Sequence, residues 1–585
     1  MAVKRLSHYR TTAALAWSGR ERSVAFGWSA FLGLVVSSPW LLQGGYLFGT
    51  DWPGPRQFDY PMSVSNWAPL EVVLATVSRI ISGEWAGKLF VLALLVVSAF
   101  AAYRAAPVRG FVPGAVASTI YLLNPFVYGR IHYGQLFLLA GYALLPTVAI
   151  AVRILLVRPS YRSGLLFGVV LVVIAITSSH VFLMAVVLTA TLLTTEALGA
   201  RDRLQFLQRL TPSLLTATGV TMILTSYWLV PLVLGHGPIA DVLSGVGSAN
   251  LGVYRAVPDD TLGLLPNLLG LYGFWAENSG RFASMKLFVP YWPAVLALLL
   301  SLGAVGVVDA VRSRRDQLAP WVAGLLAAAA VALVLEMGVS HPLTSGLVTW
   351  LDSHFPIYRG MRDAGKWAAL LAFVYSQLAA LGAVAVLQWL KARAQNAPRI
   401  ESLTSVATGL LIALPLYYGN GLLFGMHGEI RPSQYPAGWY QADRVLASDA
   451  HPGRALFLPW HEYMTYSFIQ NQNKVVAPPA PTFFSVPVLV STNPDVPGTP
   501  SSTDPDHAAI DYLVAQGSKG SWEATLRTLG VKYVLVAREV DWQAYWFLDH
   551  LPDIVKVGDY GSIVLYRVQG VGSQPATDLR SRGRT

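Results

Sequence analysis

The sequence contains no cysteine and little charge. None of its 585 residues is cysteine, and only 13% are Asp, Glu, Lys or Arg, about half the share in soluble domains. The absence of cysteine excludes disulfides, thiolate metal sites and cysteine nucleophiles. The low charge, together with apolar runs about 20 residues long, predicts a polytopic membrane protein.

Several motifs of soluble catalysis and energy coupling are also missing. We find no HExxH, no GxSxG, no Walker loop and no dinucleotide-binding fingerprint. Without a phosphate-binding loop, ATP-driven transport is not expected. The formal net charge is +10, but basic residues in a membrane protein hold loops in the cytoplasm and near anionic lipid. No basic-aromatic module is present, so we expect no nucleic-acid partner.

Apolar length predicts about eleven transmembrane helices. Two of them, near 164–179 and 181–198, are separated only by the segment Ser178, Ser179 and His180. One long kinked helix is the alternative for this pair. The predicted spans lie near 25–46, 86–106, 111–129, 134–156, 164–179, 181–198, 213–235, 287–310, 319–338, 367–390 and 403–424.

The distribution of Lys and Arg over the connecting loops supports this count. Short loops rich in basic residues stay in the cytoplasm. The basic loops hold Lys4, Arg5, Arg10, Arg20 and Arg22; Arg104 and Arg109; Arg158 and Arg162; Arg201, Arg203 and Arg209; Arg312, Arg314 and Arg315; Lys391, Arg393 and Arg399. Eleven spans place all of these loops on one side, whereas ten would place the last two outside. The prediction is therefore an inside N-terminus and an outside C-terminus.

Four segments are then predicted to face outward. Three are large loops, at 47–85, 236–286 and 339–366, and the fourth is everything after about residue 425. In the first loop, Pro69 to Ile81 places its apolar residues on one helical face. This stretch is too short to span, so we expect it to lie in the membrane interface.

The C-terminal segment is long enough for a domain. Runs at 454–460, 531–537 and 562–568 are typical of strands, and 521–530 is typical of a helix ended by glycine. Trp460, His461 and Glu462 follow the first strand, as glycan contacts or as an ordinary cluster at a strand end. The predicted organisation is a transmembrane domain at 1–424, an extracytoplasmic α/β domain at 425–570 and a disordered tail at 571–585.

Asp51 lies where the first apolar run meets water, within "LFGTDWPGPRQFDYP" at 47–61. A carboxylate at this depth can take a proton from an attacking hydroxyl, beside a partly desolvated surface that strengthens electrostatic interactions. Trp52 can stack on a sugar ring or act as an interfacial anchor. The alternative for Asp51 is a loop aspartate that caps the end of the span.

A second candidate is the basic loop "YRGMRDAGKW" at 358–367, just before a predicted span. Its Arg359, Arg362 and Lys366 suit a lipid phosphate, because arginine binds phosphate through two nitrogens and lysine adds a point charge. Basic residues that face lipid headgroups are the alternative. A basic cluster is out of place on the outer side of a membrane, which favours the phosphate interpretation.

The third candidate is "NPFVYGRIHYGQ" at 124–135, which joins two spans. Its Tyr128, Arg130, His132 and Gln135 are polar groups near membrane depth, where such groups are often functional. The alternative is a polar hairpin tip with Arg130 reaching the interface. His180, alone between apolar segments, is a substrate-binding candidate or a hydrogen-bonded packing residue.

These motifs, in this order, resemble a known superfamily. Asp51 after the first span, followed by an interfacial helix, resembles the GT-C glycosyltransferases, membrane enzymes that use polyprenyl-phosphate-linked sugars. More narrowly, "GTDWPGP", "NPFVYGRIHYGQ", "YRGMRDAGKW" and "LGVKYVLV" resemble the membrane core of the actinobacterial α-(1→3)-arabinofuranosyltransferases and the related YfhO-like proteins. The chain departs from the large arabinofuranosyltransferases in lacking their long carbohydrate-binding C-terminal extension, so the resemblance does not identify the sugar or the acceptor.

The resemblance implies roles for individual residues. Asp51 would be the base that activates the acceptor hydroxyl, Arg359 and Lys366 would contact the donor phosphate, and Asp59 and Glu71 would assist from the same loop. The reaction would be an inverting transfer to an envelope glycan or glycolipid on the outer face of the plasma membrane, with the lipid phosphate leaving. Some relatives use Mg²⁺ or Mn²⁺ and others do not. The sequence has no convincing metal cluster, so we expect none.

Two other functions remain open at this point. A lipid or polysaccharide transporter would place charges in mid-span and show repeated halves, but only Glu336 lies deep in a predicted span. A non-catalytic scaffold of envelope assembly would use the outer domain as its binding module.

Overall fold

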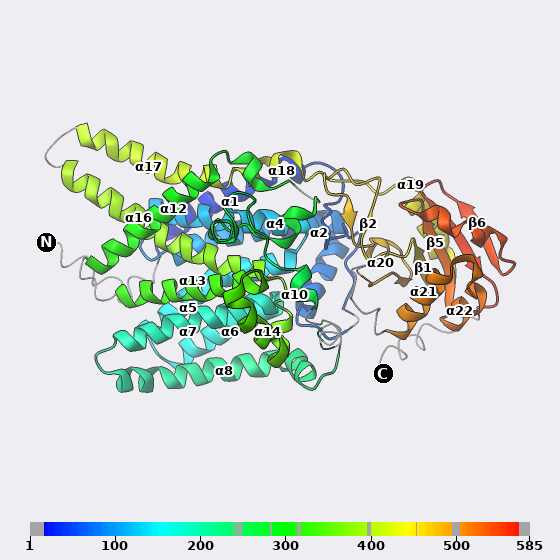
Figure 1. The fold of residues 1–585 in the computed structure, drawn as a ribbon, viewed down its shortest axis with the longest axis horizontal. Coiled ribbons are helices and arrows are strands. Elements are labelled where there is room, and N and C mark those ends of the chain that lie inside the picture. Colours follow the sequence, from blue (N-terminus) through cyan, green and yellow to red (C-terminus); the bar gives the residue numbers. More distant parts are fainter. Residues whose placement is uncertain are drawn as a thin grey trace.

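A bundle of long helices and a C-terminal sheet domain lie at opposite ends of an elongated molecule (Figure 1). The computed structural model describes residues 17–571, apart from 62, 238–239, 241–242, 244–248, 281–282, 313–317, 395–398, 452 and 494–503. Apart from residue 571, the tail predicted to be disordered lies outside the described residues. Polytopic helices followed by a sheet confirm the predicted fold class.

Every predicted span overlaps a helix, but 111–129 and 403–424 each cover a pair of helices, bent by 42° and 63°. The long helices are α1 (Gly19–Leu41), α2 (Ala68–Ala105), α3 (Phe111–Leu122), α4 (Pro125–Tyr133), α5 (Leu136–Val157), α6 (Tyr161–Thr177), α7 (Ser179–Gly199), α8 (Arg203–Val233), α12 (Trp292–Arg312), α13 (Ala319–Met337), α16 (Ala368–Ala394) and α17 (Arg399–Tyr418), with the short α18 (Leu423–Gly428) after α17. Among the described residues, eight helices are long and apolar enough to cross a membrane, and up to ten if two bent pairs each count as one span. The count of eleven and the orientation stay predictions.

The uncertain pair around Ser178 forms two separate helices. Ser178 has extended backbone angles, and its side chain accepts a hydrogen bond from the Val181 amide at the start of α7. A serine cap of this kind satisfies one of the free amides at a helix start. The two-helix interpretation of this segment is therefore confirmed.

The segments between the long helices are not open loops. The stretch at 236–286 contains α10 (Ala249–Val253), α11 (Leu264–Leu269), the 3-10 helix η4 (Trp275–Ser279) and the start of η5 (Met285–Phe288). The stretch at 339–366 contains the end of η6 (Gly338–Ser340), α14 (Pro342–His354), α15 (Pro356–Arg359) and the start of η7 (Ala364–Trp367), and η8 (Asn420–Leu422) precedes α18. These short helices bring polar residues back over the end of the bundle.

Helix α2 joins the predicted interfacial helix to the second span. The two parts meet at Ser82, whose φ of 71° lies in the left-handed region and interrupts the helix. At the next residue, an added Cβ on Gly83 would lie 2.3 Å from the carbonyl oxygen of Arg56. Only glycine therefore lets the loop that carries Asp51 rest directly on this bend.

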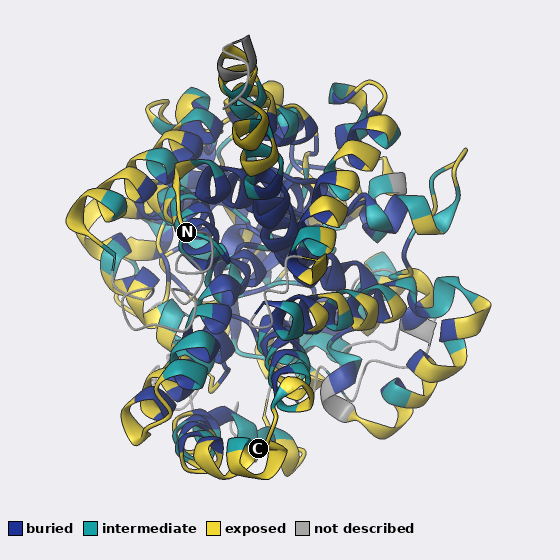
Figure 2. Ribbon diagram, turned by 90° about the vertical axis from the view of Figure 1, so that its left-hand side faces the viewer, coloured by how far each residue is buried: buried dark blue, intermediate teal, exposed yellow. Residues whose placement is uncertain are grey.

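The interior of the bundle is buried and its outer faces are exposed (Figure 2). Many of the exposed side chains are apolar. Ile223, Leu215 and Leu410 are 73%, 67% and 64% exposed, and helices that are apolar all round are typical of membrane spans. Helix α16 lies at the centre and packs against α3, α12, α13 and α17. Its residues 368–374 are almost completely buried.

Close contact between α12 and α16 depends on glycine. A Cβ on Gly382 would lie 1.8 Å from the carbonyl oxygen of Leu302, so Gly382→Ala must force the two helices apart. We expect this variant to lose about 1–3 kcal/mol of stability, seen as a lower melting temperature in detergent. The control is Gly409→Ala on α17, where the added Cβ has no atom within 4 Å. A Gly382→Ala protein as stable as the control would contradict the packing described here.

The C-terminal domain is a mixed sheet with helices on both faces. Its five-stranded sheet has the order β4-β1-β5-β7-β6, in which β1 is parallel to β4 and β5, while β7 is antiparallel to β5 and β6. The strands are β1 (Arg454–Leu458), β4 (Val488–Leu489), β5 (Val531–Ala537), β6 (Ile554–Asp559) and β7 (Ile563–Val568), and a separate pair is formed by β2 (Met464–Thr465) and β3 (Val475–Val476). The predicted strands at 454–460, 531–537 and 562–568 are thus confirmed.

Alternation along the strands divides the core of this domain into two layers. One layer joins residues of β1 and β5 to α19 (Ala437–Ser448) and α20 (Ala480–Phe483). The other layer joins the alternate residues of β1 and β5 to α21 (Pro505–Gln516), α22 (Trp522–Thr528) and the 3-10 helix η10 (Trp542–His550). The short 3-10 helix η9 (Gly517–Lys519) connects α21 to α22. Figure 1 shows the sheet between these helices.

Candidate functional site

The loop that carries Asp51 is built into both parts of the molecule. After α1, Tyr46 and Ser433 exchange backbone hydrogen bonds of 2.9 Å. The Asn471 side chain then donates to the carbonyl oxygen of Phe48 at 2.8 Å. The ring of Phe48 belongs to the apolar core of the C-terminal domain, where it contacts Tyr435. The loop is therefore fixed by the folded domain on one side and by the bend of α2 on the other.

Both carboxylate oxygens of Asp51 accept hydrogen bonds. The Tyr463 hydroxyl donates to Oδ1 at 3.0 Å, and the Gln135 amide donates to Oδ2 at 3.2 Å. The backbone amide of Asp51 donates to the Tyr133 carbonyl oxygen at 2.7 Å. Asp51 is partly buried as a residue, and these two hydrogen bonds hold its carboxylate in one orientation.

Burial raises the pKa of Asp51 above its ordinary value. Hydrogen bonds from Gln135 and Tyr463, followed by the positive charges of Lys366 and Arg130, act in the opposite direction without cancelling the effect of burial. A carboxylate with a raised pKa is a stronger base than a surface aspartate, which favours proton abstraction.

A chain of polar contacts connects Asp51 to the basic loop. Arg130 Nη1 donates to Gln135 Oε1 at 2.7 Å and to Asp363 Oδ2 at 2.5 Å. Arg130 is 1% exposed and Asp363 is 4% exposed, so the ion pair is almost fully removed from water. Two sequence candidates, the hairpin at 124–135 and the loop at 358–367, are thus brought together at Asp51.

Lys366 interacts electrostatically with Asp51 from this loop. Its ammonium group donates to the carbonyl oxygen of Gly360 at 3.0 Å, and His180 Nε2 lies 2.8 Å from the same oxygen. His180 therefore holds the backbone of the loop, which favours the packing interpretation of this histidine.

The other two arginines of the loop have different surroundings. The Arg362 guanidinium lies over the Tyr254 ring, 4.9 Å from its centre, and Tyr254 interacts electrostatically with Asp51 as well. Arg359 instead donates to the carbonyl oxygen of Asp352 at 3.2 Å. Lys366 thus acts on Asp51 directly, Arg362 lies over a tyrosine that interacts with Asp51, and Arg359 is held by α14.

Tyr128 and His132 lie away from this group. Both contact Glu429 Oε2, the tyrosine hydroxyl at 2.8 Å and the histidine Nε2 at 2.5 Å. They are four residues apart on α4, so they share one face of the helix, and Arg130 projects from another. The sequence suggested one polar cluster on this hairpin, but the helix separates it into two.

The other three candidates of the first outer loop have surroundings of their own. The Trp52 ring is 8% exposed and packs against Phe58 and Phe90, which favours packing over sugar stacking. Asp59 is exposed and interacts with Arg79, and Glu71 lies in the first turn of α2.

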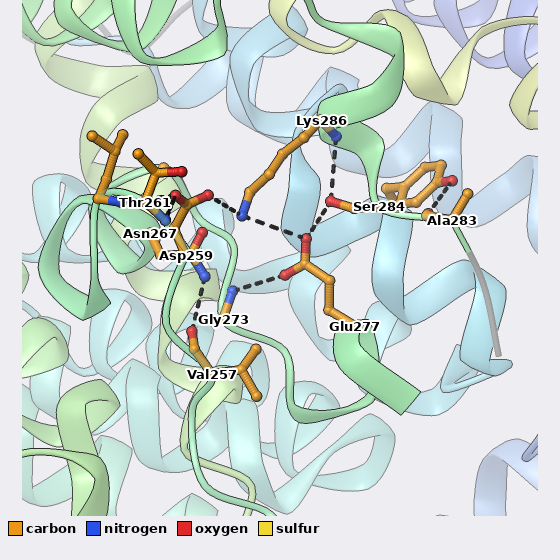
Figure 3. A network of polar contacts seen from close by, with 12 residues as sticks. Val257, Asp259, Thr261, Asn267, Gly273, Glu277, Ala283, Ser284 and Lys286 are labelled. Atoms are coloured by element: carbon orange, nitrogen blue, oxygen red, sulfur yellow. Dashed lines mark hydrogen bonds and ion pairs between the residues drawn. The ribbon is translucent and has the colours of Figure 1, made fainter. Parts of the chain in front are cut away.

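A second polar network braces the segment that follows α8 (Figure 3). Lys286 Nζ lies 2.8 Å from Asp259 Oδ2 and 4.0 Å from Glu277 Oε1. Ser284 donates to the same Glu277 oxygen, and Asp259 accepts hydrogen bonds from backbone amides. These contacts hold together the turns between residues 257 and 286. Within the described ranges, no group of three or more His, Cys, Asp or Glu side chains is arranged to hold a metal ion, and metal independence stays a prediction.

An apolar cavity of about 390 Å³ lies within the helical bundle. It is lined by side chains of α3, α12, α13, α16 and α17, including Leu299, Leu326 and Leu378. Its lining is almost entirely apolar, so it suits a hydrocarbon chain and excludes a sugar.

Two residues of the site were not found by sequence reasoning. Tyr463 is separated from Asp51 by 412 positions, and only its place directly after the Trp460–Glu462 cluster pointed to it. Asp363 lies between Arg362 and Lys366, but the phosphate interpretation of that loop rested on its basic residues alone.

Comparison with solved structures finds chains of similar fold. The chain matches arabinofuranosyltransferase AftD from Mycobacteria with a TM-score of 0.59 and 15% identity, over 95% of this chain and 40% of AftD. The chain therefore shares its fold with the matched part of this arabinofuranosyltransferase. An R1389S mutant of AftD matches with a TM-score of 0.57 and 15% identity, over 96% of this chain and 42% of the other. ArnT from Cupriavidus metallidurans aligns with a TM-score of 0.43 and 14% identity, over 93% and 97% of the two chains.

This likeness is one of fold. The chain spans about two fifths of the length of AftD. No family model and no curated protein matches the sequence. The short motifs predicted a likeness to the arabinofuranosyltransferases, and the fold of 95% of this chain agrees with it. Evidence for the activity comes from the site itself.

Proposed function

We propose that this chain is a glycosyltransferase that moves a sugar from a polyprenyl-phosphate donor to an envelope glycan or glycolipid. The observation that carries the proposal is Asp51, a carboxylate at the end of the first long helix that is oriented through both oxygens. Lys366 places positive charge near Asp51, and Arg362 lies over the ring of Tyr254, which interacts electrostatically with Asp51. A base beside phosphate-binding groups is what transfer from a lipid phosphate requires.

In the proposed reaction, the acceptor hydroxyl oxygen attacks the anomeric carbon of the donor sugar and its proton passes to Asp51. The bond between the anomeric carbon and the phosphate oxygen breaks, and the lipid phosphate leaves with the electron pair. Attack from the face opposite the phosphate inverts the anomeric centre. Lys366 and Arg362 stabilise the charge on the departing phosphate.

The surroundings of the site suit such a donor. The bundle offers an apolar cavity for a hydrocarbon chain, and the lipid phosphate would lie at the end of the helices where Asp51 is found. With a lipid phosphate as the leaving group, no nucleotide is needed, in agreement with the absence of a Walker loop. We place the site and the C-terminal domain on the outer face of the plasma membrane, as the basic cytoplasmic loops predict.

The test is glycosidic-linkage analysis of the envelope in a deletion strain, with and without the wild-type gene. We expect one linkage to disappear on deletion and to return with the wild type, which would name the sugar and its acceptor position. If the deletion strain keeps every linkage, the proposed transferase activity is refuted. Accumulation of a complete lipid-linked glycan inside the cell would instead favour a transporter.

A further inference from the structure

We infer that the C-terminal domain is part of the active site, through Tyr463, which acts as a positioning residue for the Asp51 carboxylate. The inference rests on the proposed function, because it takes Asp51 as the base. Tyr463 comes from the turn after β1, and its hydroxyl donates to Asp51 Oδ1 at 3.0 Å. Gln135, from the helical bundle, donates to Oδ2. The two oxygens of one carboxylate are therefore held by the two parts of the protein.

The turn that delivers Tyr463 is fixed on both sides. Before it, the Trp460 indole donates to Asp511 Oδ1 at 2.6 Å, and its backbone amide contacts the Tyr545 hydroxyl at 3.3 Å. After it, Met464 pairs with Val476 in the strand pair β2–β3. Because anchored residues flank Tyr463, its hydroxyl is held at a set position.

The loop that receives this contact is attached to the same domain. Asn473 donates to Thr50 Oγ1 at 2.9 Å, one residue before Asp51. The Tyr435 hydroxyl donates to the carbonyl oxygen of Gly54 at 2.7 Å. Thr50 and Tyr435 are buried, so these are shielded contacts. The domain therefore fixes the backbone around Asp51 and, through Tyr463, its side chain.

The groups that face the carboxylate come from every surrounding element. Gln135 and Tyr463 bond to it directly, Lys366 and Arg130 supply positive charge, and Tyr254 interacts with it electrostatically. Glu462, the neighbour of Tyr463, interacts electrostatically with Tyr254 and Tyr463. In this set Tyr463 is the neutral donor that comes from the C-terminal domain, so removing its hydroxyl changes no charge.

The test compares Tyr463→Phe with Tyr466→Phe in the full-length protein. Tyr466 is a buried tyrosine of the same domain whose hydroxyl has no partner in the described part of the chain, so it controls for the loss of a hydroxyl. The purified proteins are labelled with a water-soluble carbodiimide and glycine ethyl ester over a range of pH. Mass spectrometry reads the labelling of Asp51 relative to the exposed Asp59.

We expect the midpoint of Asp51 labelling to move up by about one pH unit in Tyr463→Phe. The hydrogen bond from Tyr463 stabilises the ionised carboxylate, so its removal raises the pKa of Asp51. Formation of the linkage should fall about tenfold, because an unfixed base is less well aligned. Tyr466→Phe should change neither. Tyr463→His, which restores a donor, should recover part of the midpoint shift.

The outcomes separate this inference from the proposed function. An inactive Asp51→Asn enzyme with an unshifted midpoint in Tyr463→Phe overturns the inference alone. A fully active Asp51→Asn enzyme overturns both. Equal effects of Tyr463→Phe and Tyr466→Phe on melting temperature, midpoint and activity show a general structural role and also overturn the inference.

Discussion

Replacing Asp51 with asparagine should lower the rate of sugar transfer by about 10²–10⁴-fold, the usual contribution of a general base. The amide has nearly the same shape but cannot take the proton of the acceptor hydroxyl. Its oxygen can still accept from Tyr463, which donates at 3.0 Å. The substitution therefore removes the chemistry and leaves most of the packing.

The folded protein should tolerate this change. Burial raises the pKa of Asp51, so the folded state binds a proton at this group more tightly than the unfolded chain does. The group therefore contributes less stability as pH rises through its folded pKa. A neutral amide avoids that cost, and we expect Asp51→Asn to melt at no lower temperature than the wild type at neutral pH.

The measurement is complementation of the deletion strain at matched membrane levels, with the lost linkage quantified. Asp553→Asn is the matched control, because it removes an exposed carboxylate of the C-terminal domain that pairs with Arg527, and exposed pairs contribute little. Full recovery of the linkage by Asp51→Asn would show that Asp51 is not the base.

The role of Asp51 as base also predicts how the rate of sugar transfer falls at acid pH. Asp51 must be ionised to accept a proton, so activity should fall as pH falls through its pKa. Because burial raises that pKa, the fall should occur at higher pH than a surface aspartate would give. Initial rates against pH, with the purified enzyme and the donor named by linkage analysis, provide the test. A rate that stays level down to the ordinary pKa of aspartate would contradict the raised value.

The second large effect is expected for Arg130→Met. The substitution leaves Asp363 as a buried carboxylate without its partner, and breaking a buried ion pair costs about 3–5 kcal/mol. Arg130 is 1% exposed, so water cannot replace it. We expect a large drop in melting temperature in detergent, together with loss of activity, because Gln135 loses the contact that orients it toward Asp51.

A double variant distinguishes stability from function at this position. Arg130→Met with Asp363→Leu replaces both charges with apolar groups, which is often neutral for a buried pair. We expect it to recover most of the lost melting temperature but not the activity, since Gln135 remains without its arginine. Recovery of both would show that the pair serves folding alone.

The sequence determined the elements of this protein and the depth of its key carboxylate. Every predicted span overlaps a helix, because a run of apolar residues long enough to cross a membrane forms a helix that satisfies its own backbone. The bends within 111–129 and 403–424 were not predicted. The same length argument set Asp51 just beyond the first span. Strands such as Val531–Ala537 followed from β-branched and aromatic runs bounded by turns.

The grouping of side chains was decided by the tertiary structure. Arg359, Arg362 and Lys366 look equivalent along the chain, but each has a different partner. Arg359 donates to a backbone carbonyl of α14, Arg362 lies over the Tyr254 ring, and Lys366 interacts electrostatically with Asp51. On α4, the helical rotation sends Arg130 toward Gln135 and His132 toward Glu429. Spacing along a loop does not show which carbonyl or carboxylate will lie opposite.

The contact between Asp51 and Tyr463 marks the limit of sequence reasoning most clearly. The two residues are 412 positions apart and belong to different parts of the fold. No local pattern encodes their meeting, because it depends on how the sheet domain packs its core around Phe48 and so fixes the loop. The sequence by itself placed a carboxylate at the end of a span, and only the packing of two domains gave that carboxylate its orientation.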